Sequence, residues 1–405
     1  MTSVTAESPP SGGKLLQLIL LLIAGAGFLY FIYLAASGNP KQAWLIYLVN
    51  FLFFSALAHG AMLFSTLMHF TGAKWSRALS GVAEAFSAFF PLSFVLFLIL
   101  FIGQDHLFTW LGEDLHGKEV WLNVPFLFTR DLVGILILYV LGFIYLYHSL
   151  WFRLNRSQEN TWLKRFLYKR WESGFADLEK VNRRMIFLAG WFMFTFAIVL
   201  SLLGFDLVMS MDAHWFSTLF GAYSFVKAIY SGFGALIIVA AILHMSSSNS
   251  FSLTGKQFRD ISTLFFGFSI VWADFFYCQF LVIWYGNIPE ETAYIIKRTM
   301  VQPWNIVAWV VFIGCFILPF ILLLSGKLKE LPQFMIVICT LVLAGFWMEH
   351  FLLLAPNYIK EAETVPIGIS EVIITAGFLG LFVVSISAYL KQFPELLDIK
   401  AGEVD

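Results

Sequence analysis

Residues 44–68 read WLIYLVNFLFFSALAHGAMLFSTLM. His59 is the one acidic or basic side chain in this stretch. About 20 apolar residues in a helix span the roughly 30 Å hydrocarbon core of a bilayer, so the stretch predicts a transmembrane helix. Similar runs recur along the chain and predict roughly ten spans, at 15–36, 44–68, 78–101, 128–151, 185–207, 216–245, 261–285, 304–324, 334–354 and 370–390.

The composition supports the same class of protein. Hydrophobic residues make up 60% of the chain, charged residues 13%, and the mean hydropathy is +0.81. These values lie outside the usual range of soluble domains. The apolar runs are long and continuous, whereas barrel strands are short and alternate. We therefore predict an all-α integral membrane protein.

Three other features of the sequence bear on the first span, on nucleic-acid binding and on the cysteines. The opening residues MTSVTAESPPSGG are polar, and the first apolar run is long enough to span, so we expect it to remain as an anchor. The net charge of -1 gives no indication of nucleic acid as a partner. Cys278, Cys315 and Cys339 lie in separate spans without CxxC spacing, which favours structural roles.

Lys and Arg are concentrated on one side of the predicted spans. The connection 152–184 carries the largest share, including the amphipathic stretch WLKRFLYKRWESGF, which suits a helix lying along an anionic leaflet. Basic connections face the cytoplasm in membrane proteins. We predict a multi-pass membrane protein with both termini in the cytoplasm.

Two turns of the chain resemble each other, which indicates an internal repeat. The apolar runs that begin at Gly60 and Gly234 are each followed by Thr-Gly and basic residues. Glu84 and Asp274 follow these turns at spacings that differ by about two helical turns, so we expect the two acids to face nearly the same way. We infer two parallel four-helix bundles, with the outer helices beside them. The predicted parts are 1–42 (tail and first helix), 43–208 (first bundle), 209–356 (second bundle) and 357–405 (last helix and tail).

Asp274 is the sharpest functional candidate from sequence. It lies midway along the span 261–285, with Tyr277 and Cys278 one turn further on the same face. We expect Asp274 to be buried among the helices. An ionisable residue at this depth costs roughly 2.5–3.5 kcal/mol, so function is favoured over a protonated acid bonded to a neighbouring helix.

Other ionisable residues fall at several depths. Glu84 lies toward the cytoplasmic end of its span, His59 in the inner half, and Lys227 in an outer half, where it snorkels or pairs with an acid. The residues at the predicted periplasmic span ends are expected to be mostly solvated; they are Arg130, Asp131, Asp206, Asp212, His214, Glu349, His350 and Glu371. Such groups can relay protons. The predicted proton pathway comprises Asp274, Glu84, His59, Lys227, Tyr277, Arg130, Asp131, Asp206, Glu349 and His350.

The sequence does not indicate a redox centre in this chain. It contains no phosphate loop, zinc pattern or nucleophile motif, and deep histidines are too few for a b-type haem site. We therefore expect no catalytic residue and no metal or cofactor bound by this chain, with electrons carried by partner subunits.

The segment GFDLVMSMDAHWFSTLFGAY at 204–223 carries a family resemblance. Together with the two-bundle layout, it resembles the polysulfide-reductase membrane-subunit (NrfD-like) family, specifically the ActF-type subunits of bacterial alternative complex III. The layout covers roughly 15–390, while the sequence match is specific only at 204–223 and around the WADFF stretch at 272–276.

The resemblance implies a subunit of a quinol:cytochrome c oxidoreductase, located in the bacterial inner (cytoplasmic) membrane. It implies lipids and three kinds of partner chain, namely a paralogous NrfD-like membrane subunit, an iron–sulfur subunit and c-type cytochrome subunits that hold haem c. Quinol oxidation would occur on the paralogue, and the ActF type would conduct protons through two half-channels, to which we assign Glu84 and Asp274. A complete family quinone site cannot be matched here, so quinone binding by this chain is left open.

Three other functions fit the same sequence features. The chain could be a secondary transporter that uses its internal repeat and ionisable residues. It could be a structural anchor for peripheral redox subunits, or a quinone-binding NrfD-like subunit of another respiratory oxidoreductase.

Overall fold

The structure, a computed structural model, describes residues 11–115, 117–154, 161–174, 177–246, 251–359 and 363–397. Over these residues every regular element is helical. Ten helices are long and apolar enough to cross a membrane, so the predicted all-α membrane fold is confirmed. They are α1 (Ser11–Ala36), α2 (Pro40–Phe70), α3 with α4 (Arg77–Ala85, Phe90–Ile102), α6 (Val124–Leu154), α8 (Leu178–Leu207), α9 (Leu219–Met245), α10 (Gly255–Gly286), α12 with α13 (Trp304–Phe312, Leu318–Leu323), α14 (Pro332–Tyr358) and α15 (Ile369–Gln392).

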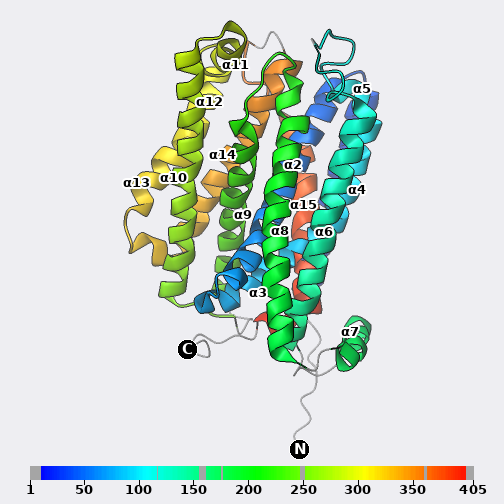
Figure 1. Cartoon of the computed structure of the whole chain (residues 1–405), viewed down its shortest axis with the longest axis vertical. Helices are drawn as coiled ribbons and strands as arrows, with labels where there is room; N and C mark the ends of the chain where they lie inside the picture. The colour runs from blue at the N-terminus through cyan, green and yellow to red at the C-terminus, as the bar shows by residue number, and fades with distance from the viewer. Residues whose placement is uncertain are drawn as a thin grey trace, which may run out of the picture.

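The long helices run side by side between two ends (Figure 1). One end carries α11 (Pro289–Thr299) and the short α5 (Gln104–Leu107); we call it the α11 end. The other carries α7 (Trp162–Gly174) and is called the α7 end. The amphipathic stretch at 162–174 forms a helix as the sequence predicts, whereas α5 and α11 were not predicted.

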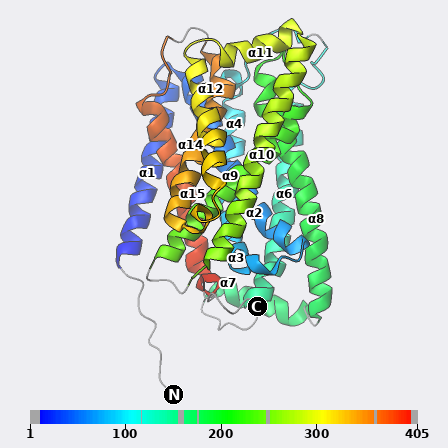
Figure 2. The same cartoon turned by 90° about the vertical axis from the view of Figure 1, so that its left-hand side faces the viewer.

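Helix neighbours repeat between the two halves of the chain. In the first, α2 packs on α3 and α8, and α6 packs on α8 and α4. In the second, α9 packs on α10 and α14, and α12 packs on α14 while α13 packs on α10. We call these sets the first and second bundles. Outside them, α1 and α15 pack on each other and on α2, side by side in Figure 2.

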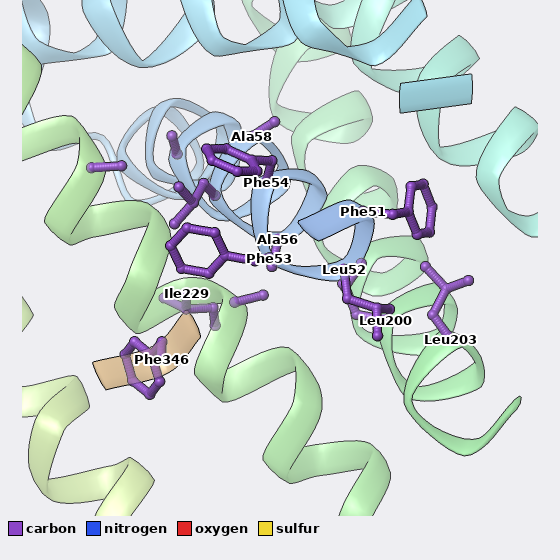
Figure 3. Packing of buried hydrophobic residues seen from close by; sticks show 14 of the residues in the cluster. Phe51, Leu52, Phe53, Phe54, Ala56, Ala58, Leu200, Leu203, Ile229 and Phe346 are labelled. Carbon is purple, nitrogen blue, oxygen red and sulfur yellow. The ribbon is translucent and has the colours of Figure 1, made fainter. Parts of the chain in front are cut away.

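Helix α2 lies at the centre of the molecule. Its most apolar window is entirely buried, because α1, α8, α9, α14 and α15 all contact it. Figure 3 shows Phe51 and Leu52 on the side of Leu200 and Leu203 of α8, and Phe53 on the side facing α9 and α14. A helix that is apolar all round is expected in such a position.

The two bundles meet where α2 crosses α9. A Cβ on Gly60 would lie 1.8 Å from the carbonyl oxygen of Ala228, and one on Gly232 would lie 2.4 Å from the backbone nitrogen of Ala61. Small residues allow this close backbone approach, as in many transmembrane helix pairs. The structure thus pairs Gly60 with Gly232 at the crossing, two positions before the Gly234 matched from sequence.

Two spans are irregular. The third changes to a 3-10 helix at Phe86–Phe89, between α3 and α4 and beginning two positions after Glu84. The eighth contains a π-helical turn at Ile313–Ile317, ahead of Pro319. The Tyr230 hydroxyl donates to the Cys315 carbonyl oxygen at 2.9 Å and so supplies a partner inside this turn. Breaks of this kind often accompany functional positions in transmembrane helices.

Candidate proton-conducting site

Glu84 lies at the centre of a polar cluster near the α7 end of the first bundle. Its side chain is fully buried. The hydroxyls of Ser65 and Ser149 each donate to Oε1 at 2.7 Å, and Arg153 donates to the same oxygen at 3.2 Å. The Tyr145 hydroxyl lies 3.2 Å from the Ser65 hydroxyl. Oε2 is buried without a hydrogen-bond partner among the described residues, so it is available to a proton or a water molecule.

A polar cavity of about 400 Å³ adjoins this cluster. Ser65, Tyr145 and Arg153 line it. Ser65 and Arg153 donate to Glu84, and Tyr145 is hydrogen-bonded to Ser65. Exposed Lys74, on the turn that leads into α3, and exposed Arg77, the first residue of α3, lie at the same cavity. A polar space of this size holds several water molecules. Water can therefore reach the groups that hold Glu84 from the α7 end.

A second cluster lies at mid-depth in the same bundle. The Tyr139 hydroxyl donates to Ser93 at 2.9 Å, and the hydroxyls of Ser93 and Ser55 are 2.7 Å apart. His59 packs against Tyr139 and Phe90, with ring centroids 5.4 and 5.2 Å away. The His59 ring is 1% exposed and neither nitrogen has a hydrogen-bond partner in the described part of the chain. Such an unpaired buried imidazole is costly and calls for water or a proton as its partner.

A third cluster lies toward the α11 end. Asp206 is fully buried and accepts two hydrogen bonds from Arg130, at 2.5 and 2.6 Å. The Trp121 indole nitrogen also donates to Asp206 at 3.1 Å, and the Arg130 guanidinium lies 3.9 Å from the Trp121 ring centroid. Asp131 is 1% exposed, interacts electrostatically with Asp206, and both of its oxygens lack a hydrogen-bond partner among the described residues.

One face of α6 connects the three clusters. Asp131, Tyr139, Tyr145 and Ser149 are all buried on this helix, and Asp131 lies 18 positions before Ser149. At 1.5 Å per residue the four side chains extend over about 27 Å, close to the thickness of a hydrocarbon core. We call these three clusters together the first-bundle polar file.

The second bundle holds a separate buried ion pair. Lys227 of α9 donates to Glu349 of α14 at 3.3 Å, and Tyr223 donates to the same carboxylate oxygen. Both charged side chains are about 5% exposed or less. Of the two alternatives for Lys227, pairing with an acid is confirmed. His350 is also buried, and its Nδ1 lies 2.8 Å from the Phe346 carbonyl oxygen.

An aromatic cleft opens beside this ion pair. It is lined by Glu349, Arg298 and mostly apolar side chains, with Trp215 and Tyr294 stacked 3.7 Å apart at one side. Aromatic walls beside a carboxylate suit the chemistry of a quinone ring. The cleft is only about 90 Å³, however, which is less than the roughly 150 Å³ that accommodates benzene. The cleft is therefore too small to enclose a quinone ring, and we derive no step through one.

Tyr294 and Arg298 of α11 close the cleft at the α11 end. The Arg298 guanidinium lies 3.5 Å from the Tyr294 ring centroid and donates to the Leu353 carbonyl oxygen of α14 at 2.8 Å. Burial raises the pKa of Tyr294 to about 12 despite the nearby guanidinium, and burial lowers the pKa of Arg298. Tyr294 is therefore a neutral hydroxyl, and Arg298 anchors α11 on α14.

Asp274 differs from the sequence-based expectation. It is exposed on the outer surface of α10, as is Tyr277, so the prediction that Asp274 is buried is wrong. Glu84 points into the first bundle while Asp274 faces outward, so the expected match between the two acids also fails. The reason is that helical spacing shows which residues share one face of a helix, whereas the neighbouring helices decide which face is buried.

Several residues at the span ends are more buried than the sequence predicts. Asp131, Asp206, Glu349, His350 and Glu371 were expected to be solvated, but all are buried. Asp212 and His214 are partly or fully exposed, as expected. The segment between α5 and α6 contributes Trp121 to the Asp206 cluster.

Sequence reasoning missed the uncharged and interfacial members of the site. Ser65, Ser149 and Tyr145 surround Glu84, and Arg153 reaches it from the end of α6. Serines and tyrosines are common in transmembrane helices, so their types alone do not single them out. The spacing of Tyr145 and Ser149 with Asp131 and Tyr139 along α6 is a signal for those two residues, whereas Ser65 comes from another helix and carries no such signal.

No group of three or more His, Cys, Asp or Glu side chains able to hold a metal ion occurs in the described ranges. No protein-family model and no curated protein matches the chain.

Proposed function

We propose that this chain is an integral membrane subunit of a quinol:cytochrome c-type oxidoreductase complex and that it conducts protons through its first bundle. The first-bundle polar file is the observation that supports this function. It supplies buried acids, hydroxyls and an imidazole at three depths, with a polar cavity at one end.

In this proposal the α7 end faces the cytoplasm, as the distribution of Lys and Arg predicts. Protons enter through the polar cavity and bind at Glu84, whose free Oε2 accepts them. They then pass the His59 and Tyr139 cluster toward Asp131 and Asp206. The clusters are separated by about 9–15 Å along the helices, so water molecules bridge them when protons move.

Glu84 is held for such a role by its neighbours. Three donors converge on Oε1, which stabilises the carboxylate, while Oε2 is left free. The opposing Arg153 side chain is 21% exposed, so water reaches the ion pair. Glu84 therefore combines a buried, hydrogen-bonded oxygen with a second oxygen that is open to a proton or a water molecule.

The partner chains carry the electrons in this proposal. Quinol is oxidised on a paralogous NrfD-like membrane subunit, and an iron–sulfur subunit and c-type cytochromes accept the electrons. The proposal does not require a quinone on this chain, in keeping with the size of the aromatic cleft.

Glu84→Gln in the purified complex, reconstituted into lipid vesicles, tests the proposal. The amide retains an acceptor for the two serines but cannot release a proton. With a short-chain quinol as donor and a soluble c-type cytochrome as acceptor, we expect fewer protons moved per electron while electron transfer continues. Proton movement is read from a pH-sensitive dye, and electron transfer from cytochrome absorbance.

Glu371→Gln is the matched control. Glu371 is equally buried but lies on α15, where it accepts from Gln42 and caps the start of the helix, outside the polar file. We expect its proton stoichiometry to equal that of the unaltered complex. An unchanged stoichiometry in Glu84→Gln would contradict the proton pathway. Copurification without haem or iron–sulfur spectra would contradict the assignment to a redox complex.

A further inference from the structure

Helix α10 is the least covered of the ten membrane-length helices in the described ranges. Only 17% of its most apolar window is buried, compared with 78% for α9 beside it. A stripe runs along it at helical spacing, in which Val271, Asp274 and Tyr277 are exposed and Gly267 and Cys278 are half-buried. We call this stripe the α10 face.

Asp274 lies at mid-depth on the α10 face. The exposed rings of Trp284 and Tyr285, typical of a membrane interface, are about 15 Å away along the helix, which is half of a roughly 30 Å core. The only hydrogen-bond contact of the carboxyl group among the described residues is with the Cys278 thiol, 3.9 Å away on the same helix. A carboxyl group facing hydrocarbon without a strong donor is unfavourable, so the isolated chain is incomplete here.

We propose that the α10 face is the docking surface for a transmembrane helix of a different membrane protein. That helix brings a hydrogen-bond donor of Lys, Arg, Asn or Gln type to the depth of Asp274. The exposed Tyr277 ring packs beside the contact. A Cβ at Gly267 would meet nothing within 4 Å, so the surface is open there to a close backbone approach, which small residues permit at transmembrane interfaces.

The chemistry of Asp274 favours a helix of a different protein over a second copy of this chain and over lipid. Two copies of this chain, oriented alike in the membrane and paired through this face, would bring one Asp274 against the other, and two carboxylates at one site repel. Lipid chains offer no hydrogen-bond donor, and headgroups lie about 15 Å from this depth.

This inference names a partner surface and rests on the proposed function only in expecting a second membrane chain in the same complex. Asp274 is exposed and lies outside the first-bundle polar file. A failed docking test therefore leaves the Glu84 result intact, and a failed Glu84 test leaves docking intact.

Photo-crosslinking in native membranes tests the docking surface directly. In the test protein, p-benzoylphenylalanine replaces Tyr277 and the chain is otherwise unaltered. In the control protein it replaces Ile137, which is exposed on α6. We expect the Tyr277 position to crosslink to a peptide from an apolar helix of another chain that carries a donor at matching depth. Crosslinks only to lipid, or only to a second copy of this chain, would overturn the proposal.

Substitution of Asp274 supplies a second measurement. Asp274→Leu is expected to weaken retention of the crosslinked partner in mild detergent by roughly 3- to 20-fold, the range for polar contacts between transmembrane helices. Asp274→Asn, which keeps an acceptor oxygen, should weaken it less. Asp274→Lys should abolish retention of the partner. Replacement of the partner's donor residue by Asp, in the same experiment, should restore retention. Equal retention in all variants, each with unchanged thermal stability, would overturn the proposal.

Discussion

The Lys227–Glu349 pair shows how a membrane interior accommodates charge. Both side chains are almost inaccessible to solvent, and each charge neutralises the other. Tyr223 donates a further hydrogen bond to Glu349. Glu349 Oε2 nevertheless lacks a partner in the described part of the chain. Removal of one member of such a pair leaves the other charge buried and unpaired.

Lys227→Met should therefore lower the free energy of unfolding by about 3–5 kcal/mol, because Glu349 loses its cation. The double variant Lys227→Met with Glu349→Gln should recover most of this loss, since no buried charge remains. Thermal unfolding in detergent, followed by tryptophan fluorescence, measures both. A double variant no more stable than the single one would contradict this account of the pair.

Residue type and position along the predicted spans are enough to mark Glu84, His59, Lys227 and Asp274 as candidates. Their roles diverge because of what surrounds them. Glu84 meets two serines and an arginine from α2 and α6, whereas Asp274 is exposed and its hydrogen-bond contact among the described residues is with Cys278 of its own helix. The residues that complete a site come from distant parts of the chain, so spacing along one helix cannot reveal them.

At the level of elements, the α2–α9 crossing holds the two bundles together. Gly60 and Gly232 bring the backbones into contact. The repeated Gly in both halves is visible in the sequence, but the register of their contact depends on the packing of whole helices.

Gly60→Leu should disrupt this crossing, because even a Cβ would lie 1.8 Å from a backbone oxygen that cannot move alone. We expect a loss of at least about 1–3 kcal/mol, the range for overpacked cores, or failure to fold. The milder Gly60→Ala should show the same direction in thermal unfolding. Gly25→Ala on α1 is the control, since a Cβ there meets nothing within 4 Å. A similar loss in both would contradict the close-packing explanation.

At the scale of the whole molecule, an even number of spans leaves α1 beginning and α15 ending at the same end (Figure 2). Helix α7 lies at that end, and Lys164 on it pairs with Glu395 beyond α15. The basic connection and the end of the described chain are thus joined on one side of the molecule.

Thiol labelling in intact cells should reveal the orientation. In a variant with Cys278, Cys315 and Cys339 replaced by alanine, Lys74→Cys introduces a thiol at the α7 end and Glu290→Cys one at the α11 end, both at exposed positions. A membrane-impermeant maleimide should label position 290 in intact cells and position 74 only after permeabilisation, because basic connections face the cytoplasm. The opposite pattern would place the α7 end outside.

The sequence by itself determined the class of fold, the approximate limits of the ten spans and the amphipathic helix at 162–174. These depend on apolar length and helical period, which are local properties of the chain. The tertiary structure decided which acids are enclosed: Glu84, Asp131, Asp206 and Glu349 are among the buried ones, and Asp274 is not. Burial is a property of neighbouring helices, and helices distant in sequence supply the donors and walls that turn a lone acid into a site.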